Sequence, residues 1–448
     1  MGIKLTPMAC ATSNLILNQR LMLVPSKMLK IIQLITALAL SLLMCQCAKL
    51  DHSAYYGLGA TAPNVRSADF KSKLATVAKA KWHDGCHVTT LPNGDAFFPE
   101  MRKAVKSAKK SITFETFAMV SGTETYYFCL ALAERARQGV KVHIILDGIG
   151  SRKLGKVCTD ILVNSGCELK WYRKFTPLRL YHINNRDHRK LLIVDGKLGF
   201  TGGAGYANAW MGNASNHSEW RDTMYKVTGK GVVDMQTIFS DNWKELTGKK
   251  ISGSAYFPSL TNTGQMTVQN TMGAPRERGD TLGGSYLLAI DAAKKSILIE
   301  HAYFAPNPRL LHAIKQARAR GVEIKVIVPG DPIDSKVLRE ASKIYWPTLM
   351  EAGVEIYEYQ TSMMHAKLIV IDDYLTIAGS GNFDDRTFFI NDESNLHVLS
   401  STLAKKQKEI FYKDLKQSKR MTPSDAKMKW TLTDIYNRVS AHLIMPQL

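Results

Sequence analysis

Two short clusters of ionisable side chains in this chain have the same residue types at the same spacing. Each has a histidine, a lysine two residues later and an aspartate five residues after the lysine. A neutral imidazole can attack phosphorus, a protonated imidazole can protonate the leaving oxygen, and ammonium groups can offset charge that develops on a phosphate. One such cluster is a weak signal, but two predict phosphodiester chemistry shared between two half-sites. The residues are His188, Lys190 and Asp195 in the first copy and His365, Lys367 and Asp372 in the second.

The segments around the two clusters also repeat. After each aspartate come six residues and then a pair of small residues, Gly202-Gly203 in the first copy and Gly379-Ser380 in the second. Upstream, AVKSAKKSITFE resembles AIDAAKKSILIE, and ALAERARQGVKVHIILDG resembles AIKQARARGVEIKVIVPG. The chain is therefore an internal duplication, and its offset of about 180 residues suits two domain-sized halves rather than a solenoid.

The predicted elements follow the same order in both halves: an amphipathic helix, an apolar run, a second helix, another apolar run, and then further strands with the histidine cluster. Strands that alternate with helices in this order predict an α/β fold. We expect two tandem homologous repeats, each a mixed sheet flanked by helices, with the active site at the interface between them.

Each histidine cluster is predicted to lie on a strand, because RKLLIVD and AKLIVID are rich in β-branched and apolar residues and end in turn signals. Residues two apart on a strand share a face, so the histidine and lysine of each copy should point the same way. The aspartate falls at the turn. Although Asp195 and Asp372 belong to the catalytic pattern, we expect them to organise the turn or support a neighbouring group.

These motifs resemble the phospholipase D superfamily, and within it the bacterial cardiolipin synthase group. The second copy, HAKLIVIDDYLTIAGSGN, is similar to the full family signature and ends in Asn382, and FDDRTFFINDESN is similar to the segment that closes a family active site. The first copy departs from the signature, because Gly205 stands where the family usually has Asn, and Asn208 is displaced. RDHRK, HSEWRD and YFAP also resemble this group, and the resemblance covers roughly residues 90–448.

The resemblance implies a phosphohistidine intermediate that is transferred to an alcohol or to water. His188 would be the nucleophile and His365 the general acid, with the reverse assignment left open. Two carboxylates, Asp222 in WRD and Glu393 in NDE, are placed to orient one histidine each, although a surface ion pair would give the same pattern. The residues expected to hold the phosphate or line the substrate side are Lys190, Lys367, Asn382, Gly202 and Ser380.

No metal or nucleotide pattern competes with this interpretation. The sequence has no CxxC pair, no HExxH and no Gly-rich loop followed by Lys-Ser/Thr. We therefore expect neither a metal nor a cofactor. Nothing repeats around His182, His217 and His301, which are expected to be packed or exposed histidines without a catalytic role.

The N-terminal region sets the expected compartment. Residues 31–45 form an apolar run preceded by Lys27 and Lys30, which is the layout of a signal peptide or a single membrane anchor. Positive charges before the run place the enzymatic body beyond the inner membrane, in the bacterial cell envelope. Cys45 gives an imperfect lipoprotein pattern, and a start at Met28 would leave the preceding residues as an upstream extension.

Four cysteines follow this region: Cys86, Cys129, Cys158 and Cys167. An exported domain can oxidise an even set, and a bridge between Cys158 and Cys167 would join a helix end to a strand start. The sequence leaves the pairing open.

The composition fits a large basic enzyme. Its 448 residues are 45% hydrophobic, and the net charge of +20 predicts a negatively charged partner, such as an anionic phospholipid membrane or nucleic acid. We favour a cardiolipin synthase-like phosphatidyltransferase that uses a phospholipid such as phosphatidylglycerol. The alternatives, in falling order, are a phospholipase D that transfers to water, a metal-independent secreted nuclease, and an envelope lipid-binding protein. Intact histidines and lysines disfavour the binding protein. Nucleic acid is the less favoured partner, because this chain has two repeats, whereas the simplest family nucleases resemble one repeat that dimerises. We expect this chain to be a monomer.

The predicted domain boundaries follow the repeats, with a Gly/Ser/Thr-rich linker between them and a basic amphipathic stretch, LAKKQKEIFYKDLKQSKR, near the end. That stretch is interpreted as the solvated face of a packing helix, with docking on a membrane surface as the alternative. The segments are 1–48 as N-terminal extension and signal or anchor, 49–90 as lead-in, 91–250 as first repeat, 251–280 as linker loop, and 281–448 as second repeat with a helical tail.

Overall fold

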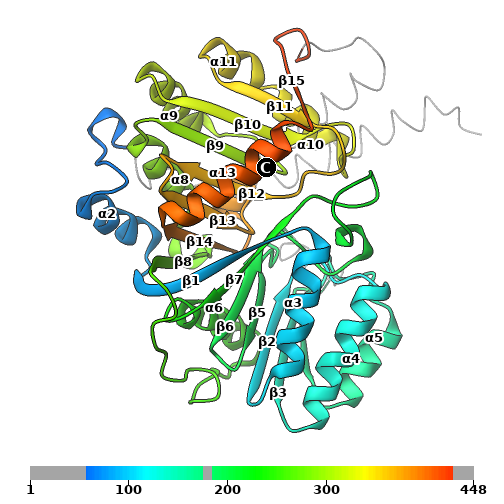
Figure 1. The fold of residues 1–448 in the computed structure, drawn as a ribbon. Helices are drawn as coiled ribbons and strands as arrows, with labels where there is room; N and C mark the ends of the chain where they lie inside the picture. Colours follow the sequence, from blue (N-terminus) through cyan, green and yellow to red (C-terminus); the bar gives the residue numbers. More distant parts are fainter. Residues whose placement is uncertain (1–56, 175–183, 427–448) are drawn as a thin grey trace, which may run out of the picture. The chain divides into compact units, whose positions relative to one another are not determined.

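A computed structural model describes residues 57–174 and 184–426 of the chain (Figure 1). Within these residues the strands form one sheet, in the order β15-β11-β10-β9-β12-β13-β14-β8-β1-β7-β6-β5-β2-β3-β4. Strands of the first half occupy one end of this order and strands of the second half the other, and β1 and β8 pair antiparallel where the halves meet. The predicted α/β fold is confirmed, with the sheets of the two halves joined edge to edge.

The first half runs from a short 3-10 helix, η1, to the long helix α6. Its elements are η1 (Gly59–Thr61), α2 (Ala68–Ala78), β1 (His83–Pro92), α3 (Gly94–Ser107), β2 (Ser111–Thr116), α4 (Thr123–Arg137), β3 (Lys141–Asp147), α5 (Lys156–Asn164), β4 (Glu168–Tyr172), β5 (Lys190–Val194), β6 (Leu198–Gly202), η3 (Asn208–Trp210), β7 (Thr223–Thr228) and α6 (Val232–Thr247).

The second half repeats this order from β1 onward and adds the short helices α7 and α10 and a short last strand. Its elements are β8 (Met266–Gly273), α7 (Pro275–Arg278), α8 (Thr281–Ala292), β9 (Ser296–His301), α9 (Pro308–Ala319), β10 (Glu323–Pro329), α10 (Lys336–Lys343), α11 (Trp346–Glu351), β11 (Glu355–Tyr359), β12 (Lys367–Ile371), β13 (Leu375–Gly379), α12 (Asp385–Phe389), β14 (Glu393–Leu399), α13 (Ser401–Leu415) and β15 (Ser418–Arg420).

The two halves share one strand topology. In the first, β2, β3 and β4 are parallel and β5 pairs antiparallel with β2; in the second, β9, β10 and β11 are parallel and β12 pairs antiparallel with β9. The carboxyl ends of the parallel strands and the amino end of the antiparallel strand therefore lie at the same sheet edge. The histidine clusters begin at this edge, because β5 and β12 each start at the cluster's lysine.

Three apolar cores hold the helices on the sheet. Helices α3, α4 and α5 pack on one face of the sheet in the first half, and α8, α9 and α11 pack on the sheet in the second half. The remaining core is shared: α6 and α13 pack against strands of both halves, including Leu191 of β5 and Leu368 of β12, both nearly fully buried. Figure 1 shows α13 lying across the strands of the second half. Burial of this shared apolar surface links the halves energetically.

The segment 251–280, expected as a linker loop, is in part a strand. Met266–Gly273 form β8, which pairs with β14 along its whole length, and Pro275–Arg278 form α7. The Gly/Ser/Thr-rich composition obscured β8, whose polar side chains are buried between neighbouring strands. The lead-in 49–90 likewise contains α2 and most of β1. The remaining domain boundaries stay predictions.

The four cysteines within the described residues are buried free thiols, so the bridge expected between Cys158 and Cys167 is not formed. Burial, and then Cys158 beside it, raises the pKa of the Cys129 thiol. The apolar run at 31–45, Cys45, Met28 and His182 lie outside the described residues. No helix within 57–174 and 184–426 is both long and apolar enough to cross a bilayer.

Candidate active site

The two histidines lie where the backbones of the two halves are hydrogen-bonded to each other. His188 precedes β5 by one residue, and its backbone N–H donates to the carbonyl of Asp392 (2.8 Å) in the second half. His365 precedes β12 by one residue, and its N–H donates to the carbonyl of Arg221 (2.7 Å) in the first half. Each histidine is thus fixed by the backbone of the opposite half.

The carboxylates paired with these histidines cross between halves in the same way. His188 Nδ1 lies 2.9 Å from Glu393 Oε1, and His365 Nδ1 lies 2.7 Å from Asp222 Oδ2. Both carboxylates are fully buried, whereas the two histidine side chains keep 12% and 8% exposure. Because each Nδ1 is engaged by a carboxylate, Nε2 is the nitrogen left for chemistry in both rings.

Aromatic rings form the walls around both imidazoles. The Phe117 ring lies edge-on to His188, with centroids 5.0 Å apart. His365 has two tryptophan neighbours, with centroids 5.4 Å from Trp210 and 5.2 Å from Trp220. These rings restrict water around the histidines and fix the planes of the imidazoles. Their roles were not evident in the sequence, because no residue of this kind repeats between the halves.

The two lysines lie in the same buried region. Lys190 Nζ donates to the carbonyl of His188 (2.5 Å), and Lys367 Nζ donates to that of His365 (2.6 Å). Burial lowers the pKa of Lys190 to about 7 and that of Lys367 to about 8. The Lys367 ammonium also lowers the pKa of Lys190, which places the lysines of both halves within one electrostatic site. A bound phosphate would reverse this, because an anion favours the charged ammonium.

The histidines are held in their neutral form in the same site. Burial, together with Lys367, lowers the pKa of His365 to about 4. Burial also lowers the pKa of His188, although Glu393 opposes this. For both carboxylates burial alone would raise the pKa, but the paired histidine outweighs it and the pKa of Asp222 and of Glu393 lies below the usual value. At neutral pH the site thus presents neutral imidazoles beside ionised carboxylates.

The two carboxylates have different supports. Ser380 Oγ donates to Glu393 Oε2 (2.5 Å). Asp222 instead accepts from the indole Nε1–H of Trp210 (3.0 Å) and from the backbone N–H of Thr223 (2.8 Å). A Cβ at Gly203, the counterpart of Ser380, would lie 2.4 Å from Asp222 Oδ1, so only glycine leaves room for this carboxylate.

The structure places two residues expected on the substrate side elsewhere. Ser380 is fully buried and supports Glu393 rather than facing a substrate. Gly202 ends β6, where a Cβ would lie 2.4 Å from the carbonyl of Thr223 in β7. Its role is close strand packing. Sequence spacing suggested that both residues face the histidines. Instead, Ser380 supports the carboxylate of Glu393, and Gly202 allows close packing against β7.

Asp195 and Asp372 lie away from the histidines, at the far ends of β5 and β12. A strand of this length spans about 17 Å, so neither carboxylate reaches the site. Asp195 Oδ1 accepts from the backbone N–H groups of Lys110 (2.7 Å) and Ser111 (3.0 Å), and Asp372 Oδ1 accepts in the same way from Lys295 and Ser296. Each also has positive φ (52° and 51°), a conformation that Asp tolerates. These contacts are the ones that the turn-organising interpretation predicts.

Asn382 is buried, and its Oδ1 has no hydrogen-bond partner among the residues that the structure describes. A phosphate-holding role would use the Nδ2–H groups of the same amide, because phosphate oxygens accept hydrogen bonds. At Gly205, in the first half, a Cβ would lie 2.7 Å from the carbonyl of Ala118, so the tight packing there excludes an asparagine. Asn208 is exposed and close to Gly122, and does not replace it.

Three buried arginines next to the site were not predicted. Arg186 pairs with Asp147 (2.8 Å), Arg189 lies 3.6 Å from Glu115, and Arg221 pairs with Asp414 (2.8 Å). Their carboxylate partners are distant in sequence, so no local spacing could reveal them. RDHRK and HSEWRD, singled out by resemblance, contain all three. His301 is buried between Tyr286 and Phe383, and His217 is exposed.

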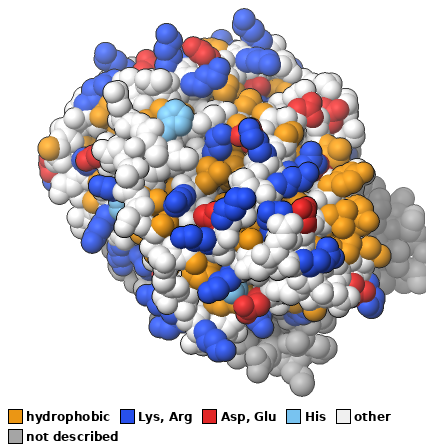
Figure 2. All heavy atoms as spheres, turned by 60° about the horizontal axis from the view of Figure 1, so that its bottom comes forward, with side chains coloured by type: hydrophobic (Ala, Val, Ile, Leu, Met, Phe, Trp, Pro, Cys, Tyr) orange, Lys and Arg blue, Asp and Glu red, His pale blue; other side chains and the backbone are white. Residues whose placement is uncertain are grey.

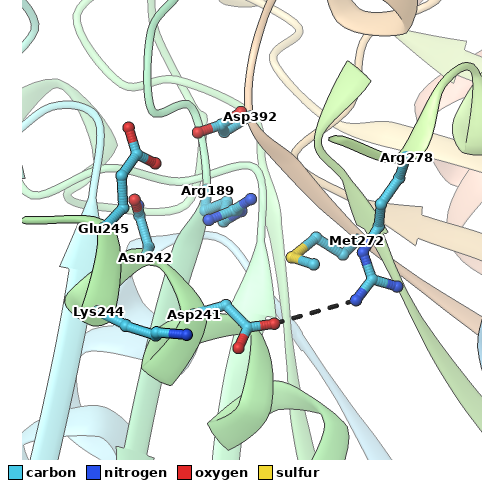
Figure 3. A pocket seen from close by; sticks show the side chains of 8 residues that line it. All are labelled: Arg189, Asp241, Asn242, Lys244, Glu245, Met272, Arg278 and Asp392. Atoms are coloured by element: carbon cyan, nitrogen blue, oxygen red, sulfur yellow. Dashed lines mark ion pairs between the residues drawn. The ribbon is translucent and has the colours of Figure 1, made fainter. Parts of the chain in front are cut away.

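A cavity of about 380 Å³ lies between the halves on the other side of β5 (Figure 3). Arg189 forms part of its wall, because it points opposite to its neighbours His188 and Lys190 along the strand. Arg278 bridges toward Asp241 at 3.9 Å. None of the reactive histidines or lysines lines this cavity, and no cluster within the described residues could hold a metal ion.

Comparisons with known proteins identify the family. The family model described as "Cardiolipin synthase, PLD-like domain" matches residues 101–264 and 286–415. The chain is 32% identical over 334 residues to a cardiolipin synthase of Geobacillus kaustophilus, covering 73% of this chain and 66% of that protein. It is 33% identical over 337 residues to one of Alkalihalophilus pseudofirmus, covering 74% and 66%.

A solved structure shows the same fold at low identity. The crystal structure of a phosphatidylserine synthase from Haemophilus influenzae superposes with a TM-score of 0.61 at 13% identity, covering 85% of this chain and all of that one. The chain spans about two thirds of the length of the curated relatives it matches. From the two matched segments and these identities, the chain belongs to the cardiolipin synthase family of PLD-like proteins, within the phospholipase D superfamily.

Proposed function

We propose that the protein is a phosphatidyltransferase that moves a phosphatidyl group from one phospholipid to an alcohol, such as a hydroxyl of phosphatidylglycerol. The observation that carries this proposal is the crossed pairing of His188 with Glu393 and of His365 with Asp222. Two imidazoles and two lysines then share one site, and Lys367 Nζ lies 3.2 Å from His365 Nε2. The relatives named cardiolipin synthase support the substrate class.

In the first step, His188 Nε2 attacks phosphorus and a nitrogen–phosphorus bond forms as the bond from phosphorus to the glycerol oxygen breaks. Glu393 at Nδ1 stabilises the imidazolium character that develops on the ring. His365, protonated in the complex with the anionic lipid, donates its Nε2 proton to the leaving oxygen. Lys190, Lys367 and the Asn382 amide hold the non-bridging oxygens.

In the second step, His365 is neutral and accepts the proton of the incoming hydroxyl. The resulting oxygen attacks phosphorus, the bond to His188 breaks, and the original imidazole returns. Asp222 orients His365 in both steps through Nδ1. The same residue therefore acts first as acid and then as base, and the cycle ends with His188 and His365 in their starting states. The reverse assignment of the two histidines is the alternative to this scheme.

The second candidate function is hydrolysis, in which water takes the place of the alcohol. The aromatic rings of Trp210, Trp220 and Phe117 around the imidazoles favour transfer, because they limit water near Nε2. We further propose an exported, envelope location with the N-terminal segment as signal or anchor, and repeats bounded near residues 91–250 and 281–448.

The proposal is tested by incubating the purified full chain, in detergent with EDTA, with phosphatidylglycerol, and resolving the products by mass spectrometry. Cardiolipin with free glycerol in equal amounts is expected. Phosphatidic acid as the main product would replace the proposal by hydrolysis. Intact lipid, together with nicked plasmid in a parallel reaction, would replace it by a nuclease.

A further inference from the structure

The most exposed large hydrophobic side chains gather on two neighbouring helices of the first half. Tyr126 and Tyr127, in the first turn of α4, are 41% and 54% exposed, and Val157 and Val163 of α5 are 65% and 55% exposed. Within residues 57–174 and 184–426 the second half has no large hydrophobic residue of this exposure. Exposed apolar residues that gather in this way mark an interaction surface.

A basic hollow of about 670 Å³ lies beside these residues, between α5 and β4. Its floor is apolar, from Leu154, Leu169 and Trp171, and its rim carries Arg152 and Lys174. The Lys174 ammonium lies 4.4 Å above the Trp171 ring. Figure 2 shows hydrophobic side chains gathered at the right of the view, with lysine and arginine side chains nearby. Figure 1 draws α4 and α5 on the same side. Apolar residues within a basic rim suit an anionic lipid surface.

This face is connected to the reactive site by hydrogen-bonded loops. Phe117, which contacts the His188 ring, accepts through its carbonyl from Ser151 Oγ (2.9 Å). Two residues further on, Met119 N–H donates to the same Ser151 Oγ (2.9 Å). Gly155 N–H, just before α5, donates to Ser121 Oγ (2.7 Å), just before α4. The N-terminal ends of α4 and α5, which carry Tyr126, Tyr127 and Val157, thus lie at the same sheet edge as the histidines, whereas Val163 is at the other end of α5.

The equivalent positions of the second half carry different side chains. The positions of Tyr126 and Tyr127 are taken by Pro308 and Arg309, and Arg309 pairs with Asp280 (2.6 Å). The position of Trp171 is taken by Glu358, which pairs with the guanidinium of Arg339, and α10 with its neighbour Ile344 covers that side. Among the described residues, the exposed tyrosines and valines beside a basic rim are therefore found in the first half.

We propose that this face, formed by Tyr126, Tyr127, Val157, Val163 and the basic rim of the hollow, docks on the surface of an anionic phospholipid bilayer. Its significance for turnover depends on the proposed function, but the docking itself does not. The first half would lie on the lipid with its histidine edge toward the interface. Lys174 and Arg152 would contact lipid phosphates, while the tyrosines and valines enter the headgroup region.

Photo-crosslinking of the full chain tests the contact without any need for turnover. Benzoylphenylalanine is placed at position 127, and in a matched protein at Lys405, an exposed residue of the basic helix α13. With vesicles of equal phosphatidylglycerol and phosphatidylcholine, we expect at least fivefold more lipid adduct at position 127, falling strongly with phosphatidylcholine alone. Equal amounts of lipid adduct at the two positions would overturn the proposed docking face. So would crosslinks from position 127 to protein and none to lipid.

A matched set of variants then connects docking to turnover. Tyr126→Ser/Tyr127→Ser/Val157→Ser should lower the rate on vesicle phosphatidylglycerol about tenfold and leave the rate on monomeric dihexanoyl-phosphatidylglycerol unchanged. Lys405→Gln/Lys413→Gln, which removes two exposed charges from α13, should change neither rate. A triple variant with the wild-type rate on vesicles would contradict the inference. If the wild-type chain turns over neither lipid, the proposed function fails, while the crosslinking pattern still decides the docking.

Discussion

The two halves of this molecule carry the same histidine strand but support it by different means. In the first half His188 stands against one aromatic ring and its carboxylate, Glu393, is held by a serine hydroxyl. In the second, His365 stands between two tryptophans, and Asp222 is held by an indole N–H. Duplication preserved the position of the histidines and lysines, whereas the environment of each histidine diverged.

The divergence gives a physical basis for unequal roles. An imidazole that switches between acid and base must hold its orientation through both protonation states, and the two tryptophans with a short aspartate contact restrict His365 in that way. His188 has the more exposed side chain. The second half has Asn382 where the first half has Gly205. Variants of the residues around each histidine therefore test the mechanism.

Replacement of the histidines should have the largest effect. His188→Ala and His365→Ala should each lower kcat by about 10³-fold or more. With a phosphatidyl ester of p-nitrophenol, whose leaving group needs no proton, His365→Ala should still release one equivalent of p-nitrophenol in a rapid-mixing experiment, whereas His188→Ala should release none. A burst from His188→Ala and none from His365→Ala would reverse the assignment.

Loss of the crossed carboxylates should come next. Glu393→Gln and Asp222→Asn should each lower kcat by about 10²- to 10³-fold with little change in KM, because the imidazole loses its fixed orientation and its charge stabilisation. Steady-state kinetics on phosphatidylglycerol in mixed micelles measure both constants. A rise in KM alone would mean that these carboxylates bind substrate rather than orient the histidines.

Removal of a buried lysine should lower activity and raise stability. Because burial lowers the pKa of Lys190 to about 7 and of Lys367 to about 8, the unfolded chain binds more protons between those values and about 10.4. The free energy of unfolding of the wild type should therefore rise with pH across this window. Lys190→Met should lose about 10²-fold in kcat/KM and should melt at a higher temperature at pH 6.

The same pKa values predict how activity depends on pH. In the free enzyme the lysines lose charge above about pH 7 to 8, so kcat/KM should fall there. The kcat profile should fall at higher pH, because bound phosphate favours the ammonium form. Coincident profiles for kcat and kcat/KM, or a lower melting temperature of Lys190→Met at pH 6, would contradict this account of the lysines.

The lone asparagine should have a smaller effect. Asn382→Ala should lower kcat/KM by about 10- to 100-fold, since one amide to the phosphate is lost. Gly205→Asn, which would restore the missing partner, should destabilise the fold by about 1–3 kcal/mol and give no gain, because its Cβ meets the Ala118 carbonyl at 2.7 Å. Denaturant melts and kinetics of both variants check this. A more active and equally stable Gly205→Asn would show that packing is not the reason for the gap.

The two aspartates at the ends of the histidine strands should have the smallest effect on turnover. Asp195→Ala and Asp372→Ala each leave backbone N–H groups without an acceptor and should cost about 1–3 kcal/mol in free energy of unfolding. The kcat of either folded variant should stay within about threefold of wild type. Urea melts and kinetics at low temperature separate the two effects, and a large loss of kcat in a fully folded variant would return these residues to the reaction.

Sequence spacing was sufficient for features that lie within one strand. The α/β class and the two tandem repeats followed from apolar patterns and duplication, and both are confirmed. Period two along the strand placed each histidine beside its lysine. The turn signal identified Asp195 and Asp372 as supports, and the structure shows them on loop amides at the far strand ends.

Features that depend on pairing between distant strands could not be deduced in the same way. β8 is hidden by a polar composition, because its neighbours β14 and β1 supply the burial that its sequence lacks. The spacing of Ser380 and Gly202 gave no sign that each serves a carboxylate-bearing strand. The aromatic walls at Phe117 and Trp210 depend on loops that differ between the repeats, so no repeated pattern could reveal them.

The central claim is that one site, shared by both halves, forms a covalent intermediate on the histidine of the first half. It is tested by rapid acid-free quenching of the full-length His365→Ala protein after mixing with the p-nitrophenyl phosphatidyl ester, followed by peptide mapping at alkaline pH. We predict one phosphatidyl group per chain, attached to His188. Three results would contradict this mechanism. They are attachment to a residue other than His188, two phosphatidyl groups per chain, and no covalent adduct during turnover.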